Sequence, residues 1–287
     1  MNRQELAQKI DTSFDFTTEE YWDGFWENPK NGISGLGTCK DGRDPDGRSS
    51  DLADVHTFLW SRKTGNKQNP DTELKLEKNY DSSYYLKDKN SGIDFSSDTL
   101  VNGYRWKRLT DLDLGNSVSG NGVIPALIRD YGQAQYRAIQ ERFTHKAYTV
   151  GGMIIFPRRS ASINSARGNN PNISDRVDLT VEWIRRFFFK EKTDISDVLE
   201  KNKDFFDLFG QGKDGFKAYI DFFFLNDLVS ADYERVYSFF GPNDFSRQNA
   251  YPGTTQEWRQ WHALAIEFID ARNDRIKKAL TEGILWE

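Results

Sequence analysis

The first half of the chain has short hydrophobic segments separated by polar turns. Residues 55–60 form a short apolar run, and residues 72–76 alternate between apolar and polar side chains, as a half-buried strand does. Two further runs, residues 84–86 and 93–95, flank the turn sequence Lys89-Asn90-Ser91-Gly92 and predict a β-hairpin. We therefore expect this part of the chain to build a sheet.

The clearest strand spans residues 148–157, YTVGGMIIFP, in which no side chain is charged. An uncharged run of this kind is typical of a strand that is buried on both faces. The pair Gly151-Gly152 allows another backbone or a ligand to approach closely. We expect this strand to lie in the centre of the sheet.

Helical spacing of apolar residues dominates the rest of the chain. It predicts helices over residues 124–147, 195–209, 216–229 and 255–280, the last with Thr254 or Thr255 as its N-cap. The many Phe side chains on these helices are expected to pack in the core.

The apolar pattern of residues 175–182 is compatible with either a strand or a helix. Their apolar positions alternate as in a strand, but Val177, Val181 and Ile184 also recur at helical spacing. The continuation through residues 183–187 favours a helix, with Ser174 or Asp175 as its N-cap.

These elements predict an α+β fold with a central mixed or antiparallel sheet and a largely helical C-terminal half. Residues 55–157 are the strand-rich part and residues 158–287 are mainly helical. No repeat or linker interrupts the pattern, so we expect residues 1–287 to form a single compact domain.

Composition narrows the classes of function. Aromatic residues make up 14% of the chain, including eight Trp and twenty-one Phe, which is enough for a large core. The net charge of −5 argues against a broad nucleic-acid-binding surface, which requires a basic excess. No apolar stretch is long enough to span a membrane, and no apolar signal segment is present, so no membrane association and a cytoplasmic location are expected.

Metal-dependent chemistry is not indicated. The single cysteine, Cys39, and three histidines are too scattered for a zinc site. Asp44 and Asp46 alternate in a loop, but the Glu at the twelfth position of an EF-hand is absent. We therefore predict no metal site.

The densest group of polar side chains follows the strongest strand, and loops that leave strand ends often bind ligands. Asn164 can donate and accept hydrogen bonds, and Arg167 offers a fork suited to carboxylate or phosphate. We expect Asn164 and Arg167 to border one pocket together with four polar residues, Ser97, Asp98, Asp175 and Arg176. Tyr21 or Trp22 is expected to form an aromatic wall of this pocket.

Several motifs resemble those of a bacterial family of unknown function. They are YWDGFW (residues 21–26), LWSR (59–62), FSSD (95–98), YTVGGMIIFP (148–157), SIN followed by RG (162–168) and DRVDLT (175–180). The resemblance covers nearly the whole chain and implies one structural unit. It implies no activity, substrate or catalytic residue.

One functional hypothesis is a nucleotide-handling enzyme of the ADP-ribosyltransferase type, with nicotinamide adenine dinucleotide (NAD) as substrate, acting as a toxin or phage-defence effector. Such enzymes use a basic residue, a serine on a strand and a glutamate in that order, which Arg62, Ser97 and Glu182 follow. Arginine can hold a pyrophosphate, and a carboxylate can stabilise an oxocarbenium-like state. The helix expected around Glu182 opposes this assignment, because transferases place the acid on a strand.

Two alternatives remain open. The Phe-rich helices can present a surface to a protein partner, such as an antitoxin, which would make the chain a non-catalytic interaction module. A nuclease is the other alternative, with a nucleic acid as substrate. Asp71, Glu73 and Lys75 partly match the acid-acid-lysine set of restriction-type nucleases, but there the first acid lies on a separate strand.

Overall fold

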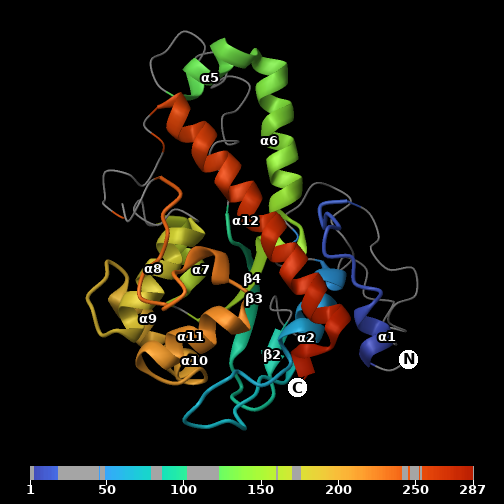
Figure 1. Cartoon of the computed structure of the whole chain (residues 1–287), viewed down its shortest axis with the longest axis vertical. Helices are drawn as coiled ribbons and strands as arrows, with labels where there is room; N and C mark the ends of the chain where they lie inside the picture. The colour runs from blue at the N-terminus through green and yellow to red at the C-terminus, as the bar shows by residue number, and fades with distance from the viewer. Residues whose placement is uncertain are drawn as a thin grey trace.

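The computed structural model describes residues 3–18, 45, 49–78, 86–101, 123–159, 161–169, 176–240, 245, 252 and 254–286. Within these ranges a four-stranded sheet is combined with many helices, and nearly all regular structure after the last strand is helical (Figure 1). The α+β class with a helical C-terminal half is confirmed. Of the two sheet types expected, the antiparallel one is present.

The sheet has the order β1 (Leu76–Lys78), β2 (Leu86–Asp88), β3 (Asp94–Thr99) and β4 (Met153–Pro157). The predicted hairpin is confirmed, because β2 and β3 pair with Leu86 opposite Phe95. The strand expected over residues 72–76 starts later, at Leu76, and Glu73 forms only an isolated bridge with Lys63.

The prediction of a central strand at residues 148–157 is wrong in the described sheet. Only residues 153–157 form a strand, which pairs with β3 from Thr99↔Met153 to Phe95↔Pro157 and occupies the edge of the sheet order. Residues 150–152 form a 3₁₀ turn, η2. All of β4 is nevertheless buried, since helix α7 (Ile163–Asn169) covers it and helix α12 (Thr255–Glu282) packs on η2.

Residues 55–60 are helical, which corrects their assignment to the sheet region. They belong to α2 (Ser50–Trp60), where the Ser49 hydroxyl accepts a hydrogen bond from the Leu52 N–H (3.1 Å). Asp51 in the first turn favours the helix dipole. The Ser49 cap lies before the apolar run at residues 55–60, so the run alone does not indicate a helix.

The other helices follow the hydrophobic spacing, with breaks that the spacing did not predict. Residues 124–147 divide at Gly132 (φ 79°) into α5 (Val123–Tyr131) and α6 (Gln133–Ala147). The remaining elements are α1 (Arg3–Ala7), α8 (Val177–Phe188), α9 (Ser196–Lys201), α10 (Lys203–Asp207), α11 (Gly212–Phe222), η3 (Asn226–Leu228) and η5 (Ile284–Trp286). No helix in the described ranges is long and apolar enough to cross a membrane.

The structure shows the N-caps of α12 and α8. The Thr254 hydroxyl accepts from the Glu257 N–H (3.1 Å), which confirms the cap of α12. Residues 177–188 form a helix, as their continuation indicated, but Arg176 holds the N-cap position, so the assignment of that cap to Ser174 or Asp175 is wrong.

Aromatic packing fills the space between the sheet and the C-terminal helices. Phe205, Phe209, Tyr219 and Phe223 are buried and their rings contact one another at centroid distances of 5.0–6.4 Å. The Phe-rich helical faces therefore form core, as expected.

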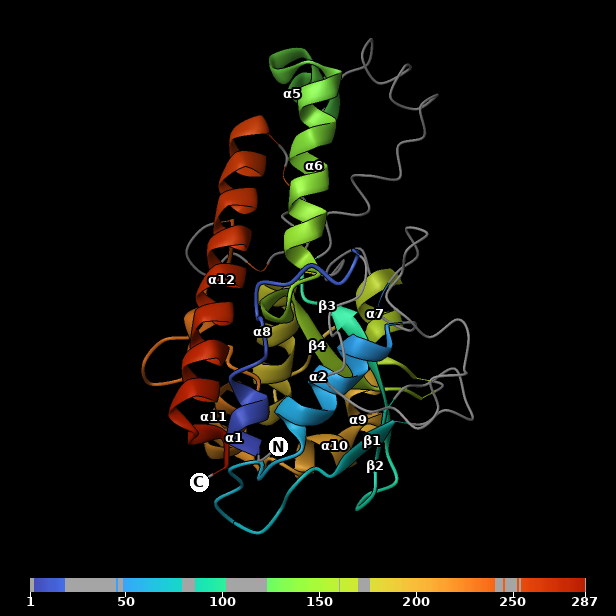
Figure 2. The same ribbon diagram turned by 90° about the vertical axis from the view of Figure 1, so that its right-hand side faces the viewer.

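Close backbone approach at Gly151 positions the longest helix. A Cβ atom there would lie 2.4 Å from the Ile269 carbonyl oxygen of α12, and the Gly151 N–H donates to Asn273 Oδ1 (2.6 Å). From this contact the N-terminal half of α12 continues beyond the sheet beside α6, and α5 packs against both helices (Figures 1 and 2).

Candidate functional site

Arg167, predicted to bind a ligand, is a buried structural anchor. Its Nε donates to Thr180 Oγ1 (2.9 Å), Nη2 to the Leu100 carbonyl (2.9 Å), and Nη1 to the Thr99 carbonyl (3.0 Å) and the Asp98 carboxylate. These bonds occupy four of the five N–H donors of the guanidinium. The side chain thus joins α7 to β3 and α8.

Asn164 lies beside the middle of β3, and Arg176 forms an isolated bridge with Val101 just beyond its end; both side chains are also engaged by the protein. Asn164 Nδ2 donates to Ser96 Oγ (3.1 Å) and to the Ser97 carbonyl (3.3 Å). Arg176 donates to Asp178 through Nε (3.1 Å) and Nη2 (2.5 Å) and lies over the Phe240 ring. The structure therefore brings together four of the predicted ligand-binding residues, as a network of internal bonds: Asp98, Asn164, Arg167 and Arg176. Tyr21, Trp22 and Asp175 lie outside the described residues.

Ser97 faces away from this network. Successive side chains of a strand point to opposite faces, and Ser97 is buried with Phe95 and Thr99 while Asp98 is on the other face. Its hydroxyl lies 2.9 Å from His56 Nε2 on α2.

The hydrogen bonds of His56 decide what this Ser–His pair can do. The Trp60 indole N–H donates to His56 Nδ1 (2.9 Å), so Nδ1 is unprotonated and Nε2 carries the proton that is donated to Ser97. Burial and the charge of Arg272 lower the pKa of His56 to about 3. His56 therefore cannot accept the Ser97 proton in this arrangement, and the pair stabilises the core.

Arg62 and Glu182, the other two proposed catalytic residues, have separate environments. Arg62 lies over the rings of Phe222 (4.4 Å) and Phe224 (5.1 Å) and donates to the Phe222 carbonyl. Glu182 is a buried carboxylate on α8 that accepts from Arg185 (2.9 and 3.1 Å) and Arg186 (2.6 Å). The three side chains of Arg62, Ser97 and Glu182 have different partners, and their contacts do not bring them together in one cavity.

A pocket of about 740 Å³ lies between α6 and α12 and is bordered on one side by the N-terminal segment through Ser13 and Asp15. We call it the α6–α12 pocket. The Phe16 N–H donates to the Tyr148 carbonyl (3.2 Å), which holds that segment against the end of α6. The lining residues are Ser13, Asp15, Tyr131, Ile139, Arg142, His145, Lys146, Thr149, Trp258, Arg259, His262 and Ile266.

Asp15 and His145 form an acid–base pair at this pocket. Asp15 Oδ2 lies 2.6 Å from His145 Nδ1, and Asp15 Oδ1 accepts from the Thr17 hydroxyl (2.7 Å) and N–H (2.9 Å). When His145 is neutral, a carboxylate at this distance keeps the proton on Nδ1 and leaves Nε2 as a proton acceptor. His145 is half-exposed, so the pair has access to solvent and to a ligand.

The lining carries an excess of positive charge. Lys146 pairs with Asp270, and Arg259 pairs with Asp130 and donates to the Tyr131 hydroxyl (2.9 Å). Arg142 forms no ion pair with any residue that the structure describes. An arginine without an ionic partner at a pocket is suited to a carboxylate or phosphate ligand.

His262 is the pocket residue with a strongly perturbed pKa. Burial and, secondarily, the charge of Arg142 lower the pKa of His262 to about 4, so the ring is neutral at physiological pH. It lies between the rings of Trp258 (4.9 Å) and Phe143 (4.7 Å). Within the described structure, His262 Nε2 and Trp258 Nε1 are buried without a hydrogen-bond partner. Such unsatisfied groups are costly and are often met by water or a ligand.

This pocket was not predicted, because its histidines have no partner nearby in the sequence. A signal was present in the helical spacing. Ile139, Arg142 and Lys146 recur at i, i+3 and i+7, and Trp258 and His262 are four residues apart, so each set shares a helix face. Recognising it required knowing that α6 and α12 face each other.

Among the described residues, no three His, Cys, Asp or Glu side chains are close enough to hold a metal ion.

A family model described as a family of unknown function, DUF6994, matches residues 10–276. The chain belongs to this family. Searches of curated proteins and of solved structures found no match. The family resemblance noted in the motifs is confirmed, and it brings no activity with it.

Proposed function

We propose that this protein binds a small anionic molecule of nucleotide type in the α6–α12 pocket, with His145 as the acid–base group. The observation that carries the proposal is that Arg142 has no ionic partner among the described residues, at a pocket whose lining also contains Lys146 and Arg259 but one carboxylate, Asp15. This basic bias is local, because the whole chain has a net charge of −5.

The size and shape of the pocket favour a small molecule over a polymer. Its volume of about 740 Å³ falls within the usual range of roughly 300–1,000 Å³ for ligand pockets. Ile139, Ile266 and Tyr131 supply apolar surface for a planar ring. Arginine and lysine can hold the phosphates, and the Ser13 hydroxyl, which donates to Asp11 Oδ1 (2.6 Å), can still accept a hydrogen bond from a ribose.

His145 supplies the chemistry in this proposal. Asp15 fixes the imidazole so that Nε2 can take a proton from an attacking hydroxyl or water and return it to a leaving group. The neutral His262 contributes a hydrogen bond without adding charge. An enzyme and a ligand-binding protein differ here only in whether His145 transfers a proton to the bound molecule.

An ADP-ribosyltransferase acting on NAD would fall within the same ligand class. The residues first considered for it, Arg62, Ser97 and Glu182, are held by different partners, so we do not base the proposal on them. NAD is nevertheless one of the test ligands, and the release of nicotinamide is its readout.

Isothermal titration of the full chain with ATP, ADP, NAD and inorganic phosphate tests the proposal. We expect at least one nucleotide to bind with a Kd between about 1 μM and 1 mM, and Arg142→Gln to weaken it at least about tenfold. Arg137→Gln is the matched control, since Arg137 is on α6 but does not line the pocket. No binding at millimolar nucleotide, or equal losses in both variants, contradicts the proposal.

A further inference from the structure

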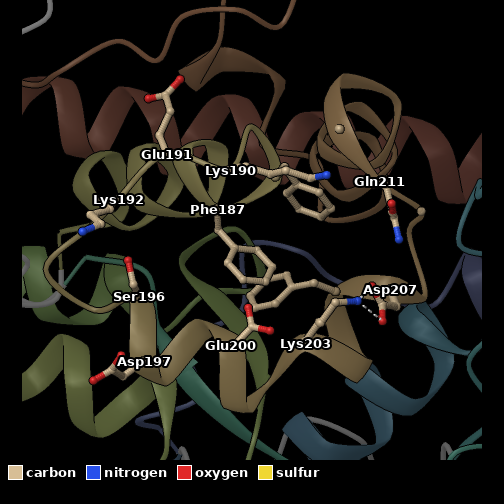
Figure 3. A pocket seen from close by; sticks show the side chains of 14 residues that line it. Phe187, Lys190, Glu191, Lys192, Ser196, Asp197, Glu200, Lys203, Asp207 and Gln211 are labelled. Carbon is tan, nitrogen blue, oxygen red and sulfur yellow. Dashed lines mark hydrogen bonds and ion pairs between the residues drawn. The ribbon is translucent and has the colours of Figure 1, made fainter.

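A second pocket, of about 530 Å³, lies among α8, α9, α10 and the start of α11, and it shares no lining residue with the α6–α12 pocket. Figure 3 shows Phe187 in its middle, with the end of α8 on one side and α9 and α10 on the other. We call it the two-walled groove. The first wall comprises Phe187, Phe188 and residues 190–192, and the second comprises Ser196, Asp197, Glu200, Lys203, Phe206 and Asp207.

The floor of the groove is aromatic. The Phe187 ring packs against Phe188 (6.1 Å) and Phe206 (5.0 Å), and Phe188 and Phe206 are both buried. Phe187 itself is only partly buried. An aromatic floor between polar rims is the arrangement that receives one apolar side chain of a partner.

The two walls carry unpaired charges of opposite sign. On the first wall, Glu191 pairs with Arg185, which leaves the exposed Lys190 and Lys192. On the second wall, Lys203 pairs with Asp207, which leaves the exposed Asp197 and Glu200. None of these four side chains forms an ion pair with another described residue.

The charges of the two walls do not pair with each other across the groove. Lysine and carboxylate side chains that face a common space normally gain little by pairing with each other at a surface. A partner segment that excludes water from the groove strengthens its ion pairs with both walls, because the local dielectric falls. Because the free charges are positive on the first wall and negative on the second, the groove favours a segment whose acidic and basic residues lie in the matching order.

We infer that the two-walled groove binds an extended peptide segment of a partner protein. The segment carries one apolar side chain, seated on Phe187, with an acidic residue on the side of Lys190 and Lys192 and a basic residue on the side of Asp197 and Glu200. This interaction is separate from ligand binding at the α6–α12 pocket and does not depend on it.

Fluorescence polarisation with labelled nonapeptides tests this inference on the full chain. Each peptide has a central Leu, and its two flanks are Glu-Glu and Lys-Lys in either order, both Glu, both Lys, or both Gln. We expect one mixed-charge order to bind with a Kd below about 100 μM and every other peptide at least about tenfold more weakly.

Reversing the charges of the walls gives the decisive control. In the quadruple variant Lys190→Glu, Lys192→Glu, Asp197→Lys and Glu200→Lys, the preferred order of the mixed-charge peptide should invert. All four side chains are exposed, so the variant should fold, which circular dichroism checks. The two Lys→Glu changes and the two acid→Lys changes cancel, so the variant has the same net charge as the wild type.

Three results overturn the inference: no peptide binds at 1 mM, the neutral peptide binds as tightly as the mixed ones, or the quadruple variant keeps the original preference. Nucleotide titration of the same variant gives an independent readout. It should be unchanged whether or not the groove binds a peptide.

Discussion

Acidification from pH 7 to pH 5 should destabilise the fold through His56. Burial in the core, with Arg272 nearby, lowers the pKa of His56 from 6.5 to about 3. The unfolded chain therefore gains a proton on this ring in the window below pH 6.5, and the folded chain does not. The stability that the neutral ring contributes is fully present above pH 6.5 and falls as the pH drops toward 3.

The size of the effect follows from proton linkage. At pH 5 the unfolded state is favoured by proton uptake at a site with pKa 6.5, while the folded site with pKa about 3 remains empty. The free energy of unfolding should then fall by about 2 kcal/mol between pH 7 and pH 5 from this residue. His56 is fully buried, so solvent screening does not reduce this estimate.

Urea denaturation of the wild type and of His56→Gln at pH 7, 6 and 5 measures the effect. Glutamine can accept from the Trp60 N–H and donate to Ser97 but does not titrate. The stability difference between wild type and variant should therefore change by about 2 kcal/mol in favour of the variant on acidification. Equal pH dependence of the two proteins would refute the reasoning, and other titrating groups cancel in the comparison.

Three substitutions test the packing account by the same urea assay. Arg167→Gln should lower the free energy of unfolding by about 3–5 kcal/mol, because it leaves the Asp98 carboxylate and buried carbonyls without hydrogen-bond donors. A loss below about 1 kcal/mol would indicate that the Arg167 side chain is free to bind a ligand. Gly151→Ala should cost about 3 kcal/mol or more, since the new Cβ meets the Ile269 carbonyl, and a neutral effect would place α12 differently. Thr254→Ala should cost about 1 kcal/mol through the lost N-cap, and no change would remove that cap.

Local chemistry in the sequence predicted several elements well. The turn at residues 89–92 predicted the hairpin of β2 and β3, and the apolar spacing after Thr254 predicted α12. The run at residues 55–60 was misassigned because six apolar-rich residues fit either a strand or a helix. The Ser49 cap that selects the helix lies before the run.

The position of β4 was not readable from its own residues. Burial on both faces and a central place in the sheet give the same uncharged pattern, and here α7 covers β4 while α12 packs on the adjacent η2. Similarly, Arg167 and Asn164 lie beside β3, but whether a polar side chain meets a ligand or its own backbone depends on tertiary contacts. The α6–α12 pocket depends on two helices more than a hundred residues apart in the chain.

A crystal structure of the protein with its tightest-binding nucleotide tests the central claim most directly. The account predicts the ligand between α6 and α12, with a phosphate oxygen within hydrogen-bond distance of the Arg142 guanidinium and a reactive oxygen near His145 Nε2. A nucleotide bound at the Arg167 network or in the two-walled groove, with the α6–α12 pocket empty, would contradict it.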